Sequence, residues 1–233
     1  EFSLPLAIIP PAFSEVPEEV VIVEGDSRDI PVSVDGSPEI LLRWRFRTAG
    51  GSYADLSDGE LAAGTTTTTL TVLDATLARE GFYQCVADNG LGEINSSEIF
   101  VRVVSNDIRE LGVNTLSDVA DGDTDNVARI LTSPGADGKI SLREALLAAN
   151  TMGGPNTITF GVTGEILLTE PLPEISDGNL TLRGNGMVRL NGTQLSDVGS
   201  GLVVRSSNNE ISGLSFYNFP ENGLVVSGAD ASE

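Results

Sequence analysis

The sequence predicts an all-β protein in which an antiparallel sandwich is followed by a stack of parallel coils that one helix closes. Apolar and polar residues alternate in short stretches spaced by about 8 to 12 residues as far as residue 105, which is typical of sandwiches. Gly-Leu-Val-Val begins at Gly201 and again at Gly223, an offset of 22 residues that indicates a solenoid. We therefore expect a sandwich over 1–105, a linker with a first strand and an acidic loop over 106–140, and a capped solenoid over 141–233.

The strands of the first part follow from this alternation. Pro10, Pro11 and Pro17 exclude an early helix, because proline has no amide hydrogen to donate. Strands are then expected at 20–23, 30–34, 41–46, 70–72, 81–87 and 99–104. Strands this short, separated by turns, predict two antiparallel sheets packed face to face.

Three features give the first part a family resemblance. The opening PPAFSEVPEEVVIVEGDS, the single tryptophan Trp44, and GFYQC with Tyr83 two residues before Cys85 resemble I-set immunoglobulin domains. The resemblance implies that Trp44 is buried, that Tyr83 forms the tyrosine corner and that Val32 replaces the partner cysteine. Cys85 would then be a free thiol packed on Trp44 and Val32. Arg79 stands where the family usually has an acidic residue.

Three arginines of the first part share one side of an expected strand. Arg43, Arg45 and Arg47 alternate with apolar residues, so they point away from the core together. One interpretation is a site for an anion or a polysaccharide. The other is a solvated sheet face whose arginines balance nearby acidic residues. Both interpretations remain open at this point.

The helix expected at residues 141–150 organises the second part. Its apolar positions fall at helical spacing: Leu142, Ala145, Leu146 and Ala149. Ser141 and Glu144 form a capping box, in which each side chain accepts a hydrogen bond from the other residue's backbone amide. A helix this short is not stable alone, so we expect it to cover the core of the first coil. Aspartate at Leu142 or Leu146 should then unfold the second part.

The acidic loop before the helix raises the question of calcium. Asp121, Asp123 and Asp125 alternate in a way that suits the oxygen ligands of Ca²⁺. An EF-hand alignment of residues 133–144 lacks carboxylates at its first two ligand positions, and the capping box already accounts for Glu144. A third alternative is an exposed, mobile acidic loop without a metal.

The second part also resembles a known family. Strands are expected at 111–116, 156–160, 164–168 and 180–183. The run SLREALLAAN, followed by PNTITF and LTLRGNG, resembles the CSLREA module and the pectate-lyase-like right-handed parallel β-helix after it. The family often has cysteine where this chain has Ile140. Its members are mostly bacterial surface proteins, so the resemblance implies a location more than an activity.

Composition narrows the classes of function. The net charge of −21 is shared by both parts and would repel nucleic acid, so no nucleic-acid partner is expected. One cysteine and no histidine exclude an internal disulfide, a Cys/His zinc cluster and a Ser-His-Asp triad. No apolar run approaches the roughly 18 residues of a membrane span.

These observations favour a non-catalytic, secreted or cell-surface bacterial protein, a fragment of a larger chain, that has an adhesive, binding or structural role. We expect no cofactor apart from possible Ca²⁺, no catalytic residue, and glycans or other surface proteins as partners. The alternative is the N-terminal part of a β-helix polysaccharide lyase or glycoside hydrolase with an accessory module, so the full-length protein could be an enzyme. The last coil should expose its core, which predicts end-to-end self-association.

Overall fold

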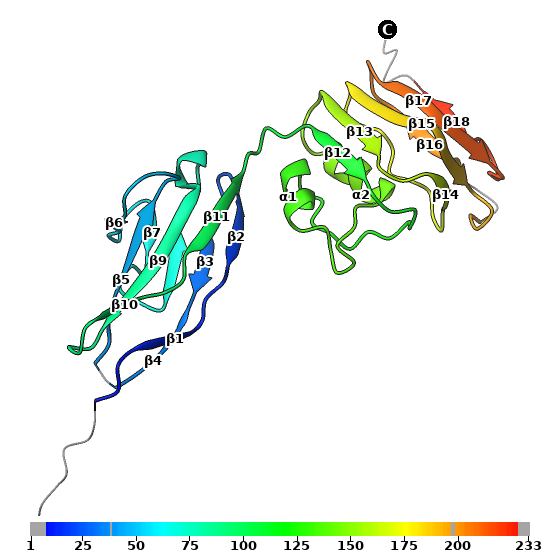
Figure 1. Cartoon of the computed structure of the whole chain (residues 1–233). Helices are drawn as coiled ribbons and strands as arrows, with labels where there is room; N and C mark the ends of the chain where they lie inside the picture. Colours follow the sequence, from blue (N-terminus) through cyan, green and yellow to red (C-terminus); the bar gives the residue numbers. More distant parts are fainter. Residues whose placement is uncertain (1–7, 38, 197–198, 228–233) are drawn as a thin grey trace, which may run out of the picture. The chain divides into compact units, whose positions relative to one another are not determined.

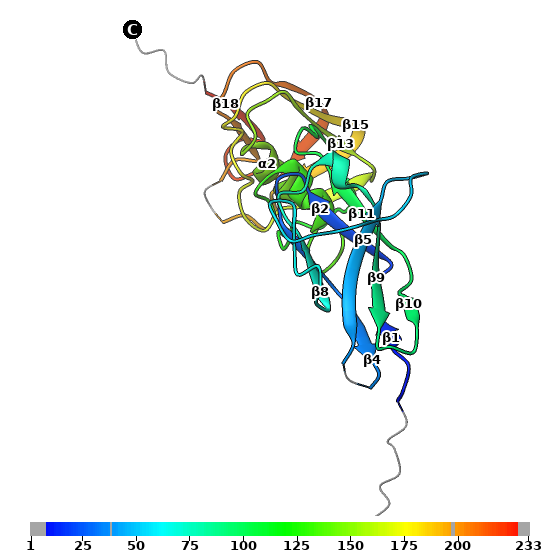
Figure 2. The ribbon, with the colours of Figure 1, turned by 90° about the vertical axis from the view of Figure 1, so that its left-hand side faces the viewer.

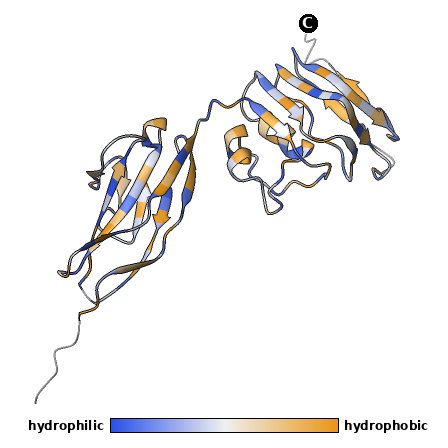
Figure 3. Cartoon of the chain, viewed as in Figure 1, coloured by the Kyte–Doolittle hydropathy of each residue, from blue (hydrophilic) through white to orange (hydrophobic). Residues whose placement is uncertain are grey.

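A computed structural model describes residues 8–37, 39–196 and 199–227 of the chain. The chain divides into two compact units, Glu1–Ser105 and Asn106–Glu233, which are described separately below (Figure 1). Apolar and polar residues alternate along the strands of both units (Figure 3). This alternation gives each strand one face toward a core and one face toward solvent.

The first unit consists of two main sheets and a short pair of strands. The larger sheet has the order β2-β11-β9-β5-β6, and β10 pairs with the C-terminal half of β9, on the side of β9 where β11 pairs with its N-terminal end. Its strands are β2 (Glu19–Val23), β5 (Leu41–Arg47), β6 (Ala54–Asp55), β9 (Gly81–Asp88), β10 (Glu93–Asn95) and β11 (Ile99–Val104). The smaller sheet joins β3 (Arg28–Pro31), β8 (Thr69–Val72) and β7 (Ala62–Ala63), and β1 (Ala12–Glu15) pairs with β4 (Ser33–Asp35).

The core of the first unit lies between these sheets. Ile30 and Leu70 of the smaller sheet and Trp44 and Cys85 of the larger one are fully buried in a single cluster. The strands pair antiparallel except β2, which runs parallel to β11. The antiparallel sandwich predicted from the sequence is therefore present.

The strands of the second unit all pair in parallel. They are β12 (Glu110–Val113), β13 (Asn156–Phe160), β14 (Gly164–Leu167), β15 (Leu180–Asn191), β16 (Leu202–Val204), β17 (Glu210–Tyr217) and β18 (Leu224–Val226). β12, β13, β15 and β17 follow one another across one sheet, and β14 pairs with the second half of β15. β16 and β18 form a second, two-stranded sheet.

The register between coils is constant only in part. Leu202 faces Leu224, which is the offset of 22 residues seen in the sequence. Thr157 faces Thr181, however, and Thr181 faces Glu210, which are offsets of 24 and 29 residues. The loops between strands vary in length and absorb these differences, so a single period describes only the last two coils.

Two helices pack against β12. The expected helix is α2 (Leu142–Ala149), and Leu142, Ala145 and Leu146 join the core of the second unit. A shorter helix, α1 (Val127–Thr132), lies in the region expected to be loop; Asn126 caps it by accepting a hydrogen bond from the Arg129 amide. In the described part of the chain, neither helix has the length or the apolar character needed to cross a bilayer.

Candidate functional site

The outer face of the larger sheet in the first unit carries the richest collection of polar and aromatic side chains. β5 turns Trp44 inward, where it is fully buried, and therefore turns its arginines outward. The views in Figures 1 and 2 place β5, β9 and β10 side by side. We call this surface the arginine face: Arg43, Arg45, Arg47, Tyr53, Asp55, Phe82, Gln84, Glu93 and Glu98.

The outer two arginines of β5 are paired with carboxylates. Arg43 Nη2 lies 2.6 Å from Glu93 Oε2, and its Nε lies 3.4 Å from Asp55 Oδ1. Arg47 Nη2 lies 2.8 Å from Glu98 Oε1. Three arginines thus share the face with three carboxylates, which makes it a surface of mixed charge rather than a cationic patch.

Tyr53 connects the arginines to Glu98. Its hydroxyl donates a hydrogen bond of 2.7 Å to Glu98 Oε1, and this bond, together with the one from Arg47, lowers the pKa of the Glu98 carboxyl. Burial, followed by the contact with Glu98, raises the pKa of the Tyr53 phenol. The guanidinium groups of Arg45 and Arg47 lie 4.5 and 5.3 Å from the Tyr53 ring centre, within the range of cation–π contacts.

Arg45, in the middle of the face, differs from its neighbours. Its Nη2 donates to Gln84 Oε1 at 2.6 Å, and the Gln84 amide in turn donates to the buried Ser96 carbonyl at 2.6 Å. Within the part of the chain that the structure describes, Arg45 forms no ion pair with a carboxylate. The central arginine is therefore held in position while its charge remains available to a partner.

The residues expected to form the centre of the first unit lie together inside it. Trp44, Cys85 and Val32 belong to one buried cluster, and Trp44 and Cys85 face each other across β5 and β9. The Tyr83 hydroxyl donates to the Arg79 carbonyl at 3.1 Å. Burial raises the pKa of the Cys85 thiol and that of the Tyr83 phenol to about 12, so both groups are neutral at physiological pH.

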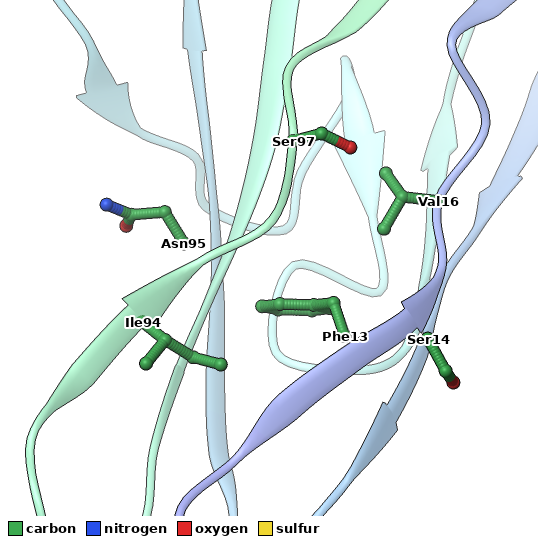
Figure 4. A pocket seen from close by; sticks show the side chains of 6 residues that line it. All are labelled: Phe13, Ser14, Val16, Ile94, Asn95 and Ser97. Carbon is green, nitrogen blue, oxygen red and sulfur yellow. The ribbon is translucent and has the colours of Figure 1, made fainter.

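A shallow hollow opens elsewhere on the first unit, between β1 and β10 (Figure 4). It encloses about 410 Å³ and is lined by Phe13, Ser14, Val16, Ile94, Asn95 and Ser97. None of these side chains carries a charge or titrates in the physiological range. The hollow therefore offers no charged side chain and no acid or base, and the arginine face remains the stronger candidate.

The structure does not bring the three aspartates of the acidic loop together. An Asp121 carboxylate oxygen accepts a hydrogen bond from the Ala136 amide, whereas Asp123 lies 3.6 Å from Arg129 and accepts from the Asp125 amide. Across residues 8–37, 39–196 and 199–227, His, Cys, Asp and Glu form no group of three or more arranged to hold a metal ion. Calcium binding by these aspartates stays a prediction.

Glu144 does more than the capping box requires. One carboxylate oxygen accepts from the Ser141 amide at 2.8 Å, and the other accepts from the Asp121 and Gly122 amides at 2.9 and 2.8 Å. The Ser141 hydroxyl accepts from the Glu144 amide, which completes the box. Backbone amides of the acidic loop therefore bind the Glu144 carboxylate and hold the loop against the helix.

Arg143, the residue before Glu144 in the helix, is also buried, and no sequence pattern identified it. Its side chain is 7% exposed and pairs with Asp118, which is 3% exposed, at 2.8 Å. It also donates to the carbonyls of Glu170 and Pro171, while Asp118 accepts from the Thr169 amide. We call Asp118, Arg143 and Glu144 the buried-charge cluster; their contacts are internal, which favours a structural role.

Comparison with known proteins identifies the first unit. Residues 11–103 match the family model of the immunoglobulin I-set domain. The first unit is an I-set immunoglobulin domain. Neuroglian of Drosophila melanogaster is 33% identical over 90 residues, which are 37% of this chain and 6% of Neuroglian, so the chain spans a small share of that relative's length.

Two solved structures are also similar to part of the chain. A complex of titin M10 with an obscurin-like 1 Ig domain is 26% identical, with a TM-score of 0.35; the match covers 42% of this chain and 96% of that one. A Dscam structure is 18% identical over 51% of this chain and 30% of that one, with a TM-score of 0.39. The family match ends at residue 103, so it does not extend into the second unit.

Proposed function

We propose that this chain is a non-catalytic binding or adhesion module of the cell surface or extracellular space, and that its I-set domain contacts partner proteins through the arginine face. The observation that carries the proposal is Arg45, a positioned arginine without a carboxylate partner among the described residues, beside Tyr53. Arginine and tyrosine are enriched where protein interfaces gain most of their free energy. The mixed charge around them suits a protein surface of complementary pattern better than a uniformly anionic polysaccharide.

The second unit is proposed to be the first coils of a right-handed parallel β-helix that supports the I-set domain. Parallel pairing from β12 to β17, and β16 on β18, is the arrangement that stacked coils require. Right-handed connection of parallel strands is the general rule. The resemblance of SLREALLAAN to bacterial surface modules supports a bacterial, secreted location. No arrangement of the described residues favours the alternative of a polysaccharide lyase or hydrolase.

A binding assay with matched charge reversals tests the proposal. Beads coated with the purified chain are incubated with arrays of recombinant extracellular proteins and of glycans, and retention is compared between the wild type and Arg45→Glu. The control is Arg28→Glu, the same charge change on β3 of the opposite sheet. We expect retention on at least one protein spot, lost by about tenfold or more in Arg45→Glu and unchanged in Arg28→Glu, as expected for a central interface arginine.

Three outcomes would contradict the proposal. Retention on neither protein nor glycan spots would remove the binding function, and equal losses in both variants would mean that net charge, rather than the arginine face, determines retention. Retention on glycan spots alone would replace the protein partner with the glycan of the original interpretation.

A further inference from the structure

Arg45 presents one open edge of its guanidinium group. Its Nε and Nη2 both donate to Gln84 Oε1, at 3.1 and 2.6 Å. Arg47 uses the same edge, but its acceptor is a carboxylate, with Nε and Nη2 at 3.2 and 2.8 Å from Glu98 Oε1. The neutral amide oxygen therefore holds Arg45 without neutralising its charge. Among the residues that the structure describes, none accepts a hydrogen bond from Arg45 Nη1, so the edge formed by Nη1 and Nη2 remains open.

The groups around this edge fix its position. Gln84 is 9% exposed, and its amide donates to the Ser96 carbonyl at 2.6 Å, so the acceptor of Arg45 is itself anchored in the sheet. The central carbon of the guanidinium lies over the Tyr53 ring, 4.5 Å from the ring centre. A guanidinium that is already fixed loses little conformational entropy when a ligand binds. Its two parallel N–H groups match the two oxygen atoms of a carboxylate.

The charges beside Arg45 restrict which anion fits. Asp55 faces Arg45 in the pairing of β5 with β6, yet its carboxylate contacts Arg43 at 3.4 Å. The side chains of Asp55, Glu93 and Glu98 are 64%, 46% and 43% exposed, so they can contact positive groups of a partner. A phosphate ester brings more negative charge and more oxygen atoms toward these carboxylates than a single carboxylate does. The net charge of −21 also repels partners that are anionic as a whole.

We propose that the arginine face recognises a partner segment in which one aspartate or glutamate side chain lies between two basic side chains. The carboxylate binds the open edge of Arg45, and the basic side chains contact Glu93 and Glu98. These two carboxylates are held by Arg43 and Arg47, each two residues from Arg45 along β5. An extended segment with basic residues two positions before and after the acidic one has the same spacing. This inference rests on the proposed function and adds the chemical class of the partner.

Short peptides with one variable position test this specificity. Peptides of sequence Lys-Ser-X-Ser-Lys are immobilised at equal density, with glutamate, glutamine or phosphoserine at X. Binding of the full chain is measured by biolayer interferometry at low salt, where charge contacts are least screened. Arg45→Lys keeps the positive charge but removes the two parallel N–H groups. Arg28→Lys, the same change on β3 of the opposite sheet, is the matched control.

We expect the wild type to bind the glutamate peptide about tenfold or more tightly than the glutamine peptide, and the phosphoserine peptide no more tightly than the glutamate peptide. Arg45→Lys should lose this preference, and Arg28→Lys should keep it. Four results would overturn the inference: no binding of the glutamate peptide, equal binding of the glutamate and glutamine peptides, tighter binding of the phosphoserine peptide, or an unchanged preference in Arg45→Lys. The proposed function is judged separately, because retention of extracellular proteins that Arg45→Glu abolishes would support it whichever peptide binds.

Discussion

The two units treat ionisable groups in opposite ways. The I-set domain buries Cys85 and Tyr83 as neutral groups and keeps its arginines on the surface, where Arg43 and its partner Glu93 are 39% and 46% exposed. The second unit buries Arg143 and Asp118 as an ion pair that is almost fully covered. The same pairing of arginine with carboxylate therefore occurs in water in one unit and in a core in the other.

The difference indicates which interactions stabilise the core of each unit. A two-sheet core of aliphatic and aromatic residues excludes water without help from charges, so the arginines of this unit can lie on its surface. The end of the coil stack is closed by short helices and loops whose backbone groups need hydrogen-bond partners. The buried-charge cluster supplies these partners, so its charges are committed to structure.

Removing Asp118 should have the largest effect. Asp118→Ala leaves Arg143 buried without its carboxylate, which should lower the free energy of unfolding of the second unit by about 3–5 kcal/mol. Glu170→Ala is the matched control, because Glu170 contacts the same arginine at 3.5 Å but is 68% exposed. Its effect should stay below about 1 kcal/mol. Urea denaturation, monitored by hydrogen exchange at the amides of β13 and β15, measures the free energy of unfolding of both variants. Equal losses would show that the buried pair contributes no more to stability than the exposed one.

Alkaline pH should have an intermediate effect on the I-set domain. Burial raises the pKa of the Cys85 thiol from 9.0 to about 12, so the unfolded chain ionises first. The buried neutral thiol therefore contributes its full stabilisation of the folded domain below pH 9, and this contribution is lost as the pH rises toward 12. Between pH 9 and pH 10 the loss should be about 1 kcal/mol.

Cys85→Ala isolates this contribution. The variant should lose stability less steeply than the wild type over the same pH interval, as measured by urea denaturation of the I-set domain at each pH. The remaining decline should begin nearer pH 10, the ordinary pKa of the Tyr83 phenol. An unchanged slope in the variant would mean that the thiol is not protected in the folded state.

Breaking a surface pair should have the smallest effect. Arg43→Ala removes the contacts with Glu93 and Asp55, and exposed pairs of this kind contribute about 1 kcal/mol or less. The midpoint of urea denaturation should therefore hardly move. A loss above about 2 kcal/mol would place the arginine face among the structural elements of the domain and would weaken the contrast between the units.

Periodic features could be read from the sequence. β13 begins and ends at the residues expected from NTITF, and α2 begins after the serine of its capping box. The alternation of Arg43, Arg45 and Arg47 with Trp44 and Phe46 correctly indicated one outward face. Each of these features depends on residues close together in the chain, which is why local patterns predicted them.

Other features depend on distant residues. β1 and β10 are too short for alternation to reveal, and the six residues of α1 cover less than two helical turns. β15 continues past the expected end at Arg183, although Asn185 and Gly186 adopt positive φ angles and the register with β17 shifts between Arg183 and Val188. Three contacts join residues more than 20 positions apart: Asp121 with Glu144, Asp118 with Arg143, and Gln84 with Arg45. No local pattern marks them.

The buried-charge cluster also bears on the order in which the chain can be completed during synthesis. Arg143 pairs with Asp118, 25 residues earlier, and donates to the carbonyl of Glu170, 27 residues later. On the ribosome, α2 therefore emerges before part of its own hydrogen-bonding environment exists. The guanidinium of Arg143 can reach the Glu170 carbonyl only after the segment around residue 170 has left the exit tunnel. The helix therefore completes its side-chain contacts only after β13 and β14 have been made.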